Sequence, residues 1–240
     1  MFFRSPRYSE QSAMNLVLAS ASPRRRELLA QAGYNFTVHP ADIPEDPLPN
    51  EDPIAYVVRL ARQKAETVFA SLSEKLGAPG IASETRENLP IDTNASASDK
   101  RASAAPQVLG ADTTVTIDGL ILAKPTDPAD AARMLRLLSG RTHRVITGVA
   151  VVTAARTEVA AEVTGVRFLT LSEKEIADYI ATGEPMDKAG AYAIQGRAAR
   201  WIPRITGDYF NVVGLPLALV SAMLEAATAC AAPAASKSSA

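Results

Sequence analysis

Three consecutive arginines, Arg24–Arg26, follow directly after the predicted start of a helix. Ser22 is a natural N-cap, and Pro23 suits the first helical position because its missing N–H costs nothing there. A helix N-terminus carries about +0.5 charge, so arginines in the first turn are unfavourable unless an anion binds beside them. Arg24 and Arg25 share the core-facing side of this helix and should line such a site. The pattern predicts a phosphate site, although the segment SPRR alone is equally typical of a solvated basic turn or a modification site.

A predicted β-hairpin brings a carboxylate and an ammonium group together. The sequence VLGADTTVTI-DG-LILAKP contains an Asp118-Gly119 turn, which is a strong hairpin signal. Counting outward from that turn places Lys124 opposite Thr113 and next to Asp112. Strict alternation would put Asp112 on the other face of the strand, so convergence on one pocket requires a bend, which Gly110 could supply. An isolated strand-end aspartate bonded by nearby amides is the competing interpretation of Asp112.

Lys64 interrupts the apolar stripe of a predicted helix that begins at Pro53 with Asp52 as its cap. A lysine in such a stripe must extend to solvent or find a partner, because unpaired burial of its charge is costly. A lone lysine of this kind more often extends to solvent. The stripe consists of apolar residues at helical spacing, namely Ile54, Val57, Val58, Ala61, Ala65 and Val68.

A glycine-flanked connection, EPMDKAGAYAIQG, contributes Asp187, Lys188 and Gln195. The Gln195 amide offers both a donor and an acceptor and could recognise a base edge, or it could bond neighbouring backbone. With the arginines, Lys64 and Lys124, the chain has cations for an anion, while Glu45 and the aspartates could hold a divalent cation. This set suits phosphoanhydride chemistry. The chain has no GxxxxGK[ST], GxGxxG or GxSxG motif, which disfavours P-loop nucleotidases, dinucleotide oxidoreductases and serine hydrolases.

Composition is that of an ordinary globular protein: 240 residues, 47% hydrophobic, with a formal net charge of -1. Near-neutral charge and the lack of an aromatic platform argue against a nucleic-acid binder. A single cysteine, Cys230, excludes an intrachain disulfide and a cysteine-based zinc site, so a bound metal would be oxygen-ligated. Apolar runs are too short to span a bilayer or to form a signal peptide, and we expect a cytoplasmic protein without membrane contact.

The expected elements form one α/β domain over residues 14–227 with a mixed, hairpin-containing sheet. Residues 1–13, 77–107 and 228–240 lack periodicity and are predicted to be a disordered extension, a flexible insert and a disordered tail. The predicted helices and strands are a strand at 16–19, a helix at 128–139, a second hairpin in RVITGVAVV and EVTGVRFLTL, a helix capped by Ser172 and Glu175 that ends at Gly183, a strand in WIPRI and a helix at 216–227.

Several blocks, in order, resemble the Maf family of nucleoside triphosphate pyrophosphatases, also called septum formation proteins. They are ASASPRRRELL, RLARQKA, LGADTTV, AKP, LSGRTHRVITGV, GEPMDKAGAYAIQG and GDYFNVVGLPL. The resemblance extends from Asn15 to Leu224 apart from the insert. It implies an elongated α/β fold similar to the inosine-triphosphate pyrophosphatases, a central cleft, and Mg²⁺ or Mn²⁺ as the metal.

The resemblance also implies roles for individual residues. Asp112 is expected to accept a proton, Glu45 to hold metal or water together with Asp112, and Lys124 to complete the catalytic set. The expected substrate-binding residues are Arg25, Lys64 and Lys124 for the triphosphate, Arg24, Thr113 and Gln195 for the base, and Ser20, Ser22, Asp187 and Lys188 elsewhere on the nucleotide.

The AIQG form with Gln195 resembles the branch that hydrolyses dTTP and UTP, with modified pyrimidine nucleotides as further substrates. The products would be the monophosphate and pyrophosphate, and this would limit incorporation of non-standard nucleotides. Two alternatives stay open: a nucleotide-binding regulator of cell division without turnover, and a pyrophosphatase that prefers 7-methyl-GTP. The sequence also allows a homodimer, and does not fix the metal or the preferred nucleotide.

Overall fold

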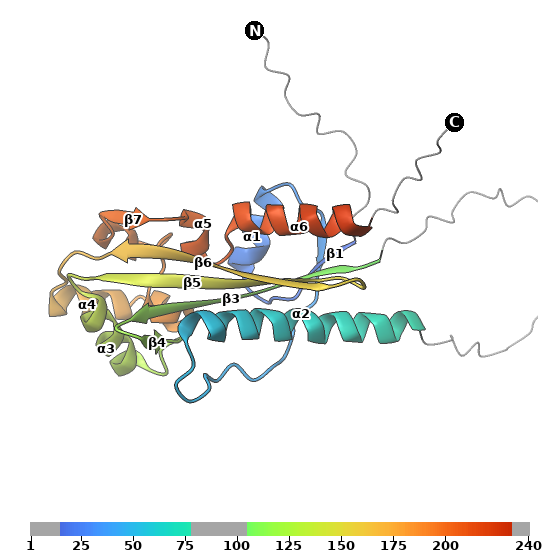
Figure 1. The fold of residues 1–240 in the computed structure, drawn as a ribbon. Coiled ribbons are helices and arrows are strands. Elements are labelled where there is room, and N and C mark those ends of the chain that lie inside the picture. Colours follow the sequence, from blue (N-terminus) through green and yellow to red (C-terminus); the bar gives the residue numbers. More distant parts are fainter. Residues whose placement is uncertain (1–14, 78–104, 232–240) are drawn as a thin grey trace, which may run out of the picture.

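The computed structural model describes residues 15–77 and 105–231, which form an elongated molecule around one long, mixed sheet (Figure 1). The strands are β1 (Leu16–Leu18), β2 (Phe36–Val38), β3 (Gln107–Ile117), β4 (Leu120–Leu122), β5 (Thr142–Val152), β6 (Thr157–Arg167) and β7 (Arg204–Thr206). Their order is β2-β1-β3-β5-β6-β7, with β4 beside β3. Strand β1 is parallel to β2 and β3, whereas the remaining pairs are antiparallel.

Helices cover both faces of this sheet (Figure 1). The long helix α2 packs along one face, and α1 and α6 pack on the other. Helices α3 and α4 close the end of the molecule that contains β4. The helical segments are α1 (Pro23–Gln31), α2 (Pro53–Gly77), α3 (Pro128–Leu138), α4 (Glu173–Ile180), α5 (Tyr209–Val213), α6 (Leu217–Ala231) and the 3₁₀ segments η1 (Glu184–Asp187), η2 (Ala189–Ala191) and η3 (Arg197–Trp201).

Alternation along the strands explains why the sheet needs cover on both sides. On β1, Leu16 and Leu18 pack into the cluster that includes α1 and α6, whereas Val17 packs into the cluster that includes α2. Successive strand side chains point to opposite faces, so a fully apolar strand is stable only between two layers. This layering confirms the expected α/β fold with a mixed sheet.

Two glycines let α2 lie unusually close to the sheet. A Cβ at Gly110 of β3 would stand 2.2 Å from the carbonyl oxygen of Ala61, and one at Gly148 of β5 would stand 2.3 Å from that of Val57. Real side chains do not tolerate such contacts. Because Asp112 is two residues beyond Gly110, it lies on the same face and meets α2 at short range.

One edge of β3 is interrupted in its middle. Strand β5 pairs with β3 from Val108 to Thr116 on one side, without a gap. On the other side β1 pairs with residues 107–109 and β4 with residues 115–117. Within the described part of the chain, residues 110–114 therefore have no strand partner on that edge. Side chains from both faces of β3 can reach this opening.

Several expected elements are confirmed. The Asp118-Gly119 turn has φ values of 52° and 80° and pairs Ile117 with Leu120. Asp127 caps α3, and Ser172 and Glu175 form the capping box of α4. The second hairpin is β5 and β6.

Other expectations were wrong in detail. Ile54 is 39% exposed, so the buried stripe of α2 excludes it and instead includes Tyr56 and Leu60. Tyr56 is buried against the loop that precedes α2, where its hydroxyl bonds the Glu45 carbonyl. Helix α6 continues to Ala231, beyond the predicted end at residue 227, and Thr228 bonds Gln107. Gly77 ends α2 and Gln107 begins β3, so neither belongs to the insert. Residues 1–14, 78–104 and 232–240, where the remaining predictions of disorder fall, lie outside the described residues.

Candidate active site

A pocket of about 570 Å³ opens at the interrupted edge of β3. Its wall is formed by the β1–α1 turn, the loop before α2, the middle of β3, the residues after β4, the η1–η2 connection and the end of α5. It is within the range of small-molecule sites in proteins. Every predicted site residue lines this pocket: Ser20, Ser22, Arg24, Arg25, Glu45, Lys64, Asp112, Thr113, Lys124, Asp187, Lys188 and Gln195.

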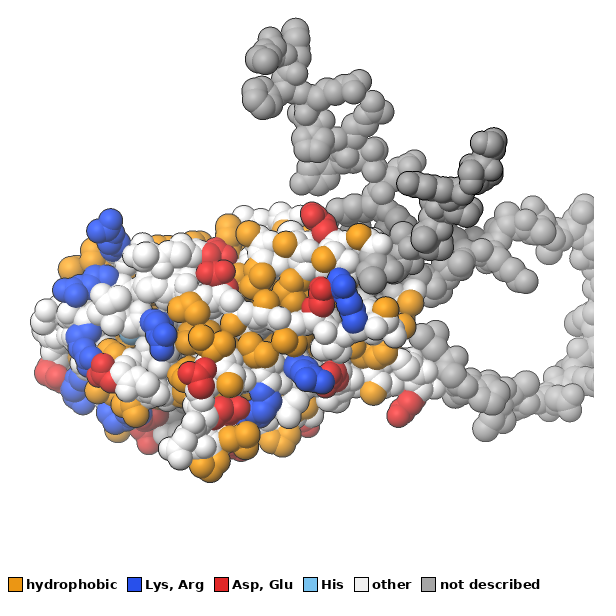
Figure 2. All heavy atoms as spheres, in the orientation of Figure 1, with side chains coloured by type: hydrophobic (Ala, Val, Ile, Leu, Met, Phe, Trp, Pro, Cys, Tyr) orange, Lys and Arg blue, Asp and Glu red, His pale blue; other side chains and the backbone are white. Residues whose placement is uncertain are grey.

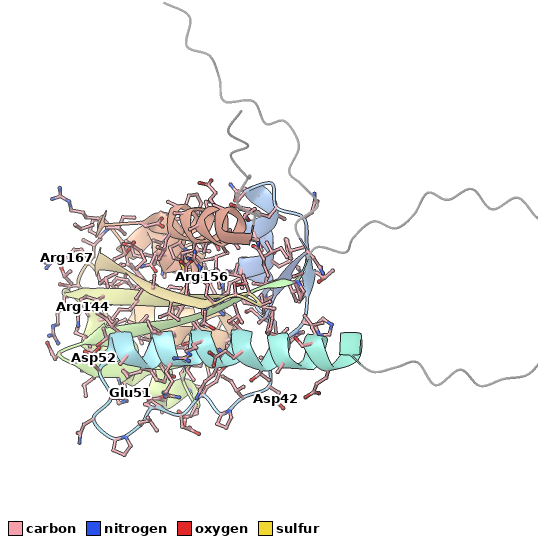
Figure 3. All side chains as sticks on the ribbon, turned by 45° about the vertical axis from the view of Figure 1, so that its right-hand side comes forward. Asp42, Glu51, Asp52, Arg144, Arg156 and Arg167 are labelled. Carbon is pink, nitrogen blue, oxygen red and sulfur yellow. The ribbon has the colours of Figure 1, made fainter. Side chains whose placement is uncertain are left out.

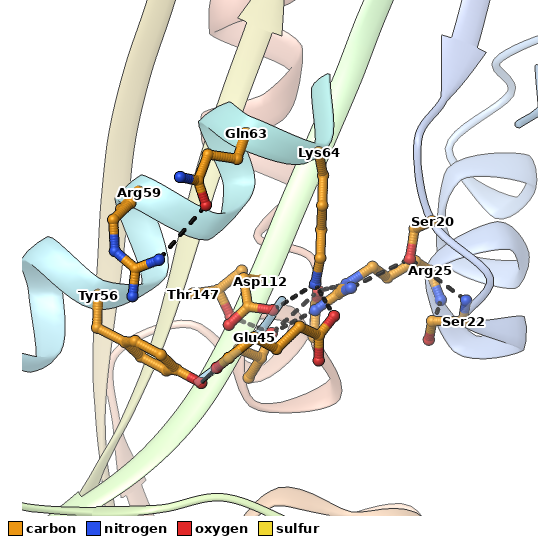
Figure 4. A network of polar contacts seen from close by, with 12 residues as sticks. Ser20, Ser22, Arg25, Glu45, Tyr56, Arg59, Gln63, Lys64, Asp112 and Thr147 are labelled. Carbon is orange, nitrogen blue, oxygen red and sulfur yellow. Dashed lines mark hydrogen bonds and ion pairs between the residues drawn. The ribbon is translucent and has the colours of Figure 1, made fainter. Parts of the chain in front are cut away.

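Lys64 joins two carboxylates at the centre of the pocket (Figure 4). Its Nζ lies 2.7 Å from an oxygen of Asp112 and 2.6 Å from an oxygen of Glu45. The side chains of Lys64 and Asp112 are 8% and 10% exposed, whereas Glu45 is half exposed. The lysine in the apolar stripe therefore finds partners inside the protein and does not extend to solvent.

The two carboxylates have opposite electrostatic environments. Burial raises the pKa of Asp112, although the charges of Lys64 and Arg25 oppose this shift. For Glu45, burial alone would raise the pKa, but the hydrogen bond and charge of Lys64, with Lys124 and Arg25, outweigh it and lower the pKa. A buried carboxylate of raised pKa beside an ionised one is typical of a site that moves a proton.

Arg25 is held by three acceptors on three elements. Its Nε donates to the Gly214 carbonyl at 2.8 Å, Nη1 to Ser20 Oγ at 3.1 Å and Nη2 to Thr113 Oγ1 at 3.0 Å. Burial lowers the pKa of Arg25, while Asp112 and Glu45 oppose the shift. A guanidinium has five N–H groups, so one on each Nη is left for a ligand. Two parallel donors of this kind match a phosphate.

The first turn of α1 also contacts the η1–η2 connection. Arg24 Nη1 lies 4.0 Å from an oxygen of Asp187, and Asp187 pairs in turn with Lys188. For Asp187, burial would raise the pKa, but Lys188 and Arg24 outweigh it and the pKa is lowered. Ser22 caps α1 by accepting the backbone N–H of Arg25.

The convergence of Asp112 and Thr113 does not need the bend that alternation suggested. Asp112 meets Lys64 on the α2 side of β3, while Thr113 meets Arg25 on the α1 side. Both reach one pocket because the strand edge between β1 and β4 is open. Lys124 lies beyond the paired part of β4, so the extrapolated pairing with Thr113 does not form, yet its exposed side chain lines the same pocket.

Sequence reasoning missed two residues of the site, Tyr56 and Thr147. Tyr56 lines the pocket and donates from its hydroxyl to the Glu45 carbonyl at 2.8 Å. Thr147 lies 2.9 Å from Thr113 Oγ1 and donates to the Asn211 carbonyl, so it supports the threonine that holds Arg25. Tyr56 could have been found from its position two helical turns before Lys64, whereas nothing in the sequence indicated Thr147.

The pocket provides a limited set of metal ligands. Across residues 15–77 and 105–231, no group of three or more His, Cys, Asp or Glu side chains is placed to hold a metal ion. Two carboxylates, Glu45 and Asp112, do converge. Mg²⁺ in nucleotide enzymes is commonly bound by one or two carboxylates together with substrate phosphates, so this donor set fits a metal that arrives with a nucleotide.

Comparison with known proteins gives a consistent result over nearly the whole chain. Curated relatives named dTTP/UTP pyrophosphatase include those of Koribacter versatilis (47% identical over 214 residues, 89% of this chain and 95% of that one) and Moorella thermoacetica (48% over 211 residues, 87% and 93%). The relative of the same name from Geobacter metallireducens is 49% identical over 204 residues, or 84% of this chain and 90% of that one.

A solved structure titled nucleoside-triphosphatase / dITP/XTP pyrophosphatase, from Mycobacterium abscessus, matches 92% of this chain and 100% of that one. Its TM-score of 0.38 and identity of 13% are too low to bear on the chemistry. No helix within the described ranges has the length and apolar character needed to cross a membrane.

The family described as Maf-like protein matches residues 15–227, which contain every pocket residue named above. The chain therefore belongs to the Maf family.

Proposed function

We propose that this protein hydrolyses dTTP and UTP to the nucleoside monophosphate and pyrophosphate. The observation that carries the proposal is the convergence of Arg25, Lys64 and Lys124 with Glu45 and Asp112 in one pocket. Three cations suit a triphosphate, and a buried carboxylate of raised pKa suits a general base. The names of relatives at 45–49% identity support the same activity and the same nucleotides.

The reaction we propose is attack of water on the α-phosphorus. The Asp112 carboxylate takes the proton from the water as its oxygen bonds to phosphorus. The bond between the α-phosphorus and the bridging oxygen breaks, and pyrophosphate leaves with the electron pair. Arg25, Lys64 and Lys124 stabilise the negative charge that grows on the leaving group. Asp112 must be ionised to act, and the charges of Lys64 and Arg25 favour the ionised form, although burial outweighs them and raises the pKa.

Glu45 and Asp112 would also hold a divalent cation, Mg²⁺ or Mn²⁺, between the protein and the phosphates. When bound, such an ion neutralises phosphate charge and acts as a Lewis acid. In the structure both carboxylates bond the Lys64 ammonium, so this region already accommodates positive charge between them. Base selection we assign to Arg24, Thr113 and Gln195, and further nucleotide contacts to Ser20, Ser22, Asp187 and Lys188, which line the same pocket.

The test is pyrophosphate release by the purified protein with Mg²⁺ or Mn²⁺, comparing dTTP, UTP, CTP, GTP and 7-methyl-GTP. Turnover of dTTP and UTP to monophosphate and pyrophosphate supports the proposal. A preference for 7-methyl-GTP would contradict the assigned specificity. Binding of nucleotides without any turnover would favour a regulator of cell division. Tight, salt-sensitive binding of oligonucleotides would favour a nucleic-acid function. Sedimentation analysis would test whether a homodimer forms.

A further inference from the structure

The segment that carries Glu45 contains neither helix nor strand. Residues 39–52 run from the end of β2 to the start of α2, and Figure 3 shows this loop passing beside α2 toward Glu51 and Asp52. Pro44 and Pro47 limit the backbone on both sides of Glu45. A carboxylate on such a loop is placed only as well as the loop is fixed, so the contacts between the loop and α2 decide where Glu45 lies.

Tyr56 of α2 holds the backbone of Glu45 (Figure 4). Its hydroxyl donates to the Glu45 carbonyl at 2.8 Å, and the residue is only 5% exposed. A tyrosine hydroxyl is protonated at neutral pH and so remains a donor. It fixes the backbone of the residue whose side chain bonds Lys64.

Arg59, one turn further along α2, holds the loop at two more points. Its Nε and Nη2 lie 2.6 and 2.7 Å from the two carboxylate oxygens of Glu51, and Nη2 also donates to the Asp46 carbonyl at 3.2 Å. The guanidinium carbon lies 5.7 Å from the centre of the Tyr56 ring. The side chains of Glu51 and Arg59 are 8% and 22% exposed. Bidentate geometry of this kind fixes orientation as well as distance.

Glu51 connects Arg59 to the backbone of the loop. The oxygen of Glu51 that bonds Arg59 Nη2 also accepts the backbone N–H of Leu48 at 2.9 Å, and the Glu51 N–H donates to the Leu48 carbonyl at 3.1 Å. One helix face thus contacts the loop at residues 45, 46 and 51, through side chains three residues apart.

We propose that Tyr56 and Arg59 are positioning residues, which fasten the loop 39–52 to α2 so that the Glu45 carboxylate stays against Lys64 and Asp112. Neither side chain is assigned a contact with the substrate. The inference rests on the proposed function for its kinetic consequence, whereas its structural consequence can be measured in the free protein.

The variants are Tyr56→Phe, which removes one hydroxyl, and Arg59→Lys, which keeps the charge but not the bidentate pair. Arg62→Ala is the matched control, because Arg62 lies one turn of α2 away and pairs with Glu66 on the exposed side. In the free protein, we expect faster amide hydrogen exchange in the segment 46–52 for Tyr56→Phe and Arg59→Lys. Arg62→Ala should match the wild type there. Unchanged exchange in both loop variants would overturn the proposal.

The kinetic readout uses dTTP and separates kcat from KM. Loss of one positioning hydrogen bond should lower kcat about 3- to 10-fold and change KM less than about twofold. The decisive comparison is with Glu45→Gln: adding Tyr56→Phe to that variant should lower kcat no further, because the carboxylate it positions is already absent. Multiplicative losses in the double variant, or a kcat of Tyr56→Phe equal to that of Arg62→Ala, would overturn the inference.

The two proposals fail in different ways. A wild-type protein without turnover would contradict the proposed function, while hydrogen exchange would still decide whether Tyr56 and Arg59 hold the loop. Thermal unfolding by circular dichroism confirms that each variant is folded. Should Arg59→Lys unfold, Tyr56→Phe alone carries both readouts.

Discussion

Two polar clusters contact the same sheet and differ in charge. The charged cluster, at the open edge of β3, consists of Arg25, Glu45, Lys64, Asp112 and Lys124. The neutral network consists of two hydrogen-bonded sets, His143 of β5 with Tyr192, and Asn211 of α5 with Thr164 of β6, all buried. There His143 Nε2 lies 2.8 Å from the Tyr192 hydroxyl, and Asn211 Nδ2 donates to the Val145 carbonyl and to Thr164 at 3.0 and 2.9 Å.

The difference shows what each cluster is for. Hydrogen-bonded neutral groups can be buried at little net cost and fix the packing around them, although His143 Nδ1 and Asn211 Oδ1 have no partner among the described residues. Burial of ionised groups is costly even when they are paired. In the charged cluster, cations outnumber carboxylates by three to two, and the surplus faces a pocket. Such an arrangement is better matched to a bound anion than to the stability of the free protein.

The exposed surface in Figure 2 is a third environment for charged side chains. On that face hydrophobic side chains gather over the middle of the molecule, between α2 and α6, and many Lys and Arg side chains lie toward the end that holds α4 and β7. Ion pairs on the surface, such as Lys174 with Asp178, are well exposed and contribute little. Charged side chains are therefore common in this protein, and the burial of Lys64 and Asp112 is what distinguishes the pocket.

The largest effect should come from Asp112→Asn. If Asp112 is the general base, kcat for dTTP should fall by about 10²–10⁴-fold, because the amide cannot accept the proton. Steady-state pyrophosphate release measures this, and thermal unfolding should show a folded protein. Turnover within about threefold of the wild type would contradict a catalytic role for the charged cluster.

Lys124→Ala should be the next largest. Lys124 is exposed at the pocket, and loss of a positioned charge on the leaving pyrophosphate typically costs about 10²–10³ in rate. The melting temperature should stay unchanged, because the side chain packs little. Lys174→Ala, on the outer surface, is the control. A variant that loses stability and retains kcat would place Lys124 in a structural role.

Asn211→Ala tests the neutral network. It should lower stability, whereas the two variants above should lower turnover. Removing the amide leaves the Val145 carbonyl and the Thr164 hydroxyl without their donor, at a cost of about 1–3 kcal/mol in the free energy of unfolding. The melting temperature should fall by about 2–12 °C. An unchanged melting temperature would mean that this network does not stabilise the fold.

The smallest effect at neutral pH should come from His143, as a pH dependence of stability that develops only below about pH 6.5. Burial lowers the pKa of His143 to about 3, against about 6.5 in an unfolded chain. Protons then bind the unfolded state more readily, so stability is complete above pH 6.5 and falls as the pH drops toward 3, by up to about 1.4 kcal/mol per pH unit. Replacing both partners, His143→Phe with Tyr192→Phe, should flatten the dependence of the free energy of unfolding on pH, as measured by denaturant unfolding. An equally steep curve would assign the dependence to other groups.

The sequence predicted much of the fold because its signals were local. The Asp118-Gly119 turn, the Asp127 cap and the Ser172 capping box each depend on residues within a few positions, and each formed. The exposure of Ile54 was missed because it lies in the first turn of α2, and the burial of Tyr56 was missed because its partner is the carbonyl of Glu45 in the preceding loop. The continuation of α6 was missed because Thr228 finds its partner, Gln107, 121 residues away.

The residues of the candidate site were predictable in type, but their contacts were not. Lys64 was expected to extend to solvent or find a partner, and only the packing of α2 onto Gly110 and Gly148 decides in favour of Asp112. Alternation along β3 suggested that Asp112 and Thr113 would diverge. The pairing of β1 and β4 with separate parts of β3 leaves the edge open, and such pairing between distant segments leaves no mark in the local sequence.

The open edge at residues 110–114 also bears on solubility. Unpaired strand edges commonly recruit strands from other chains and so promote aggregation. Here the open stretch is five residues long, about 17 Å, and paired strands lie directly before and after it. A foreign strand would collide with β1 or β4 before it could form a ladder. The protein can thus keep backbone groups accessible to a small ligand while the same opening is too short to seed the assembly of one chain upon another.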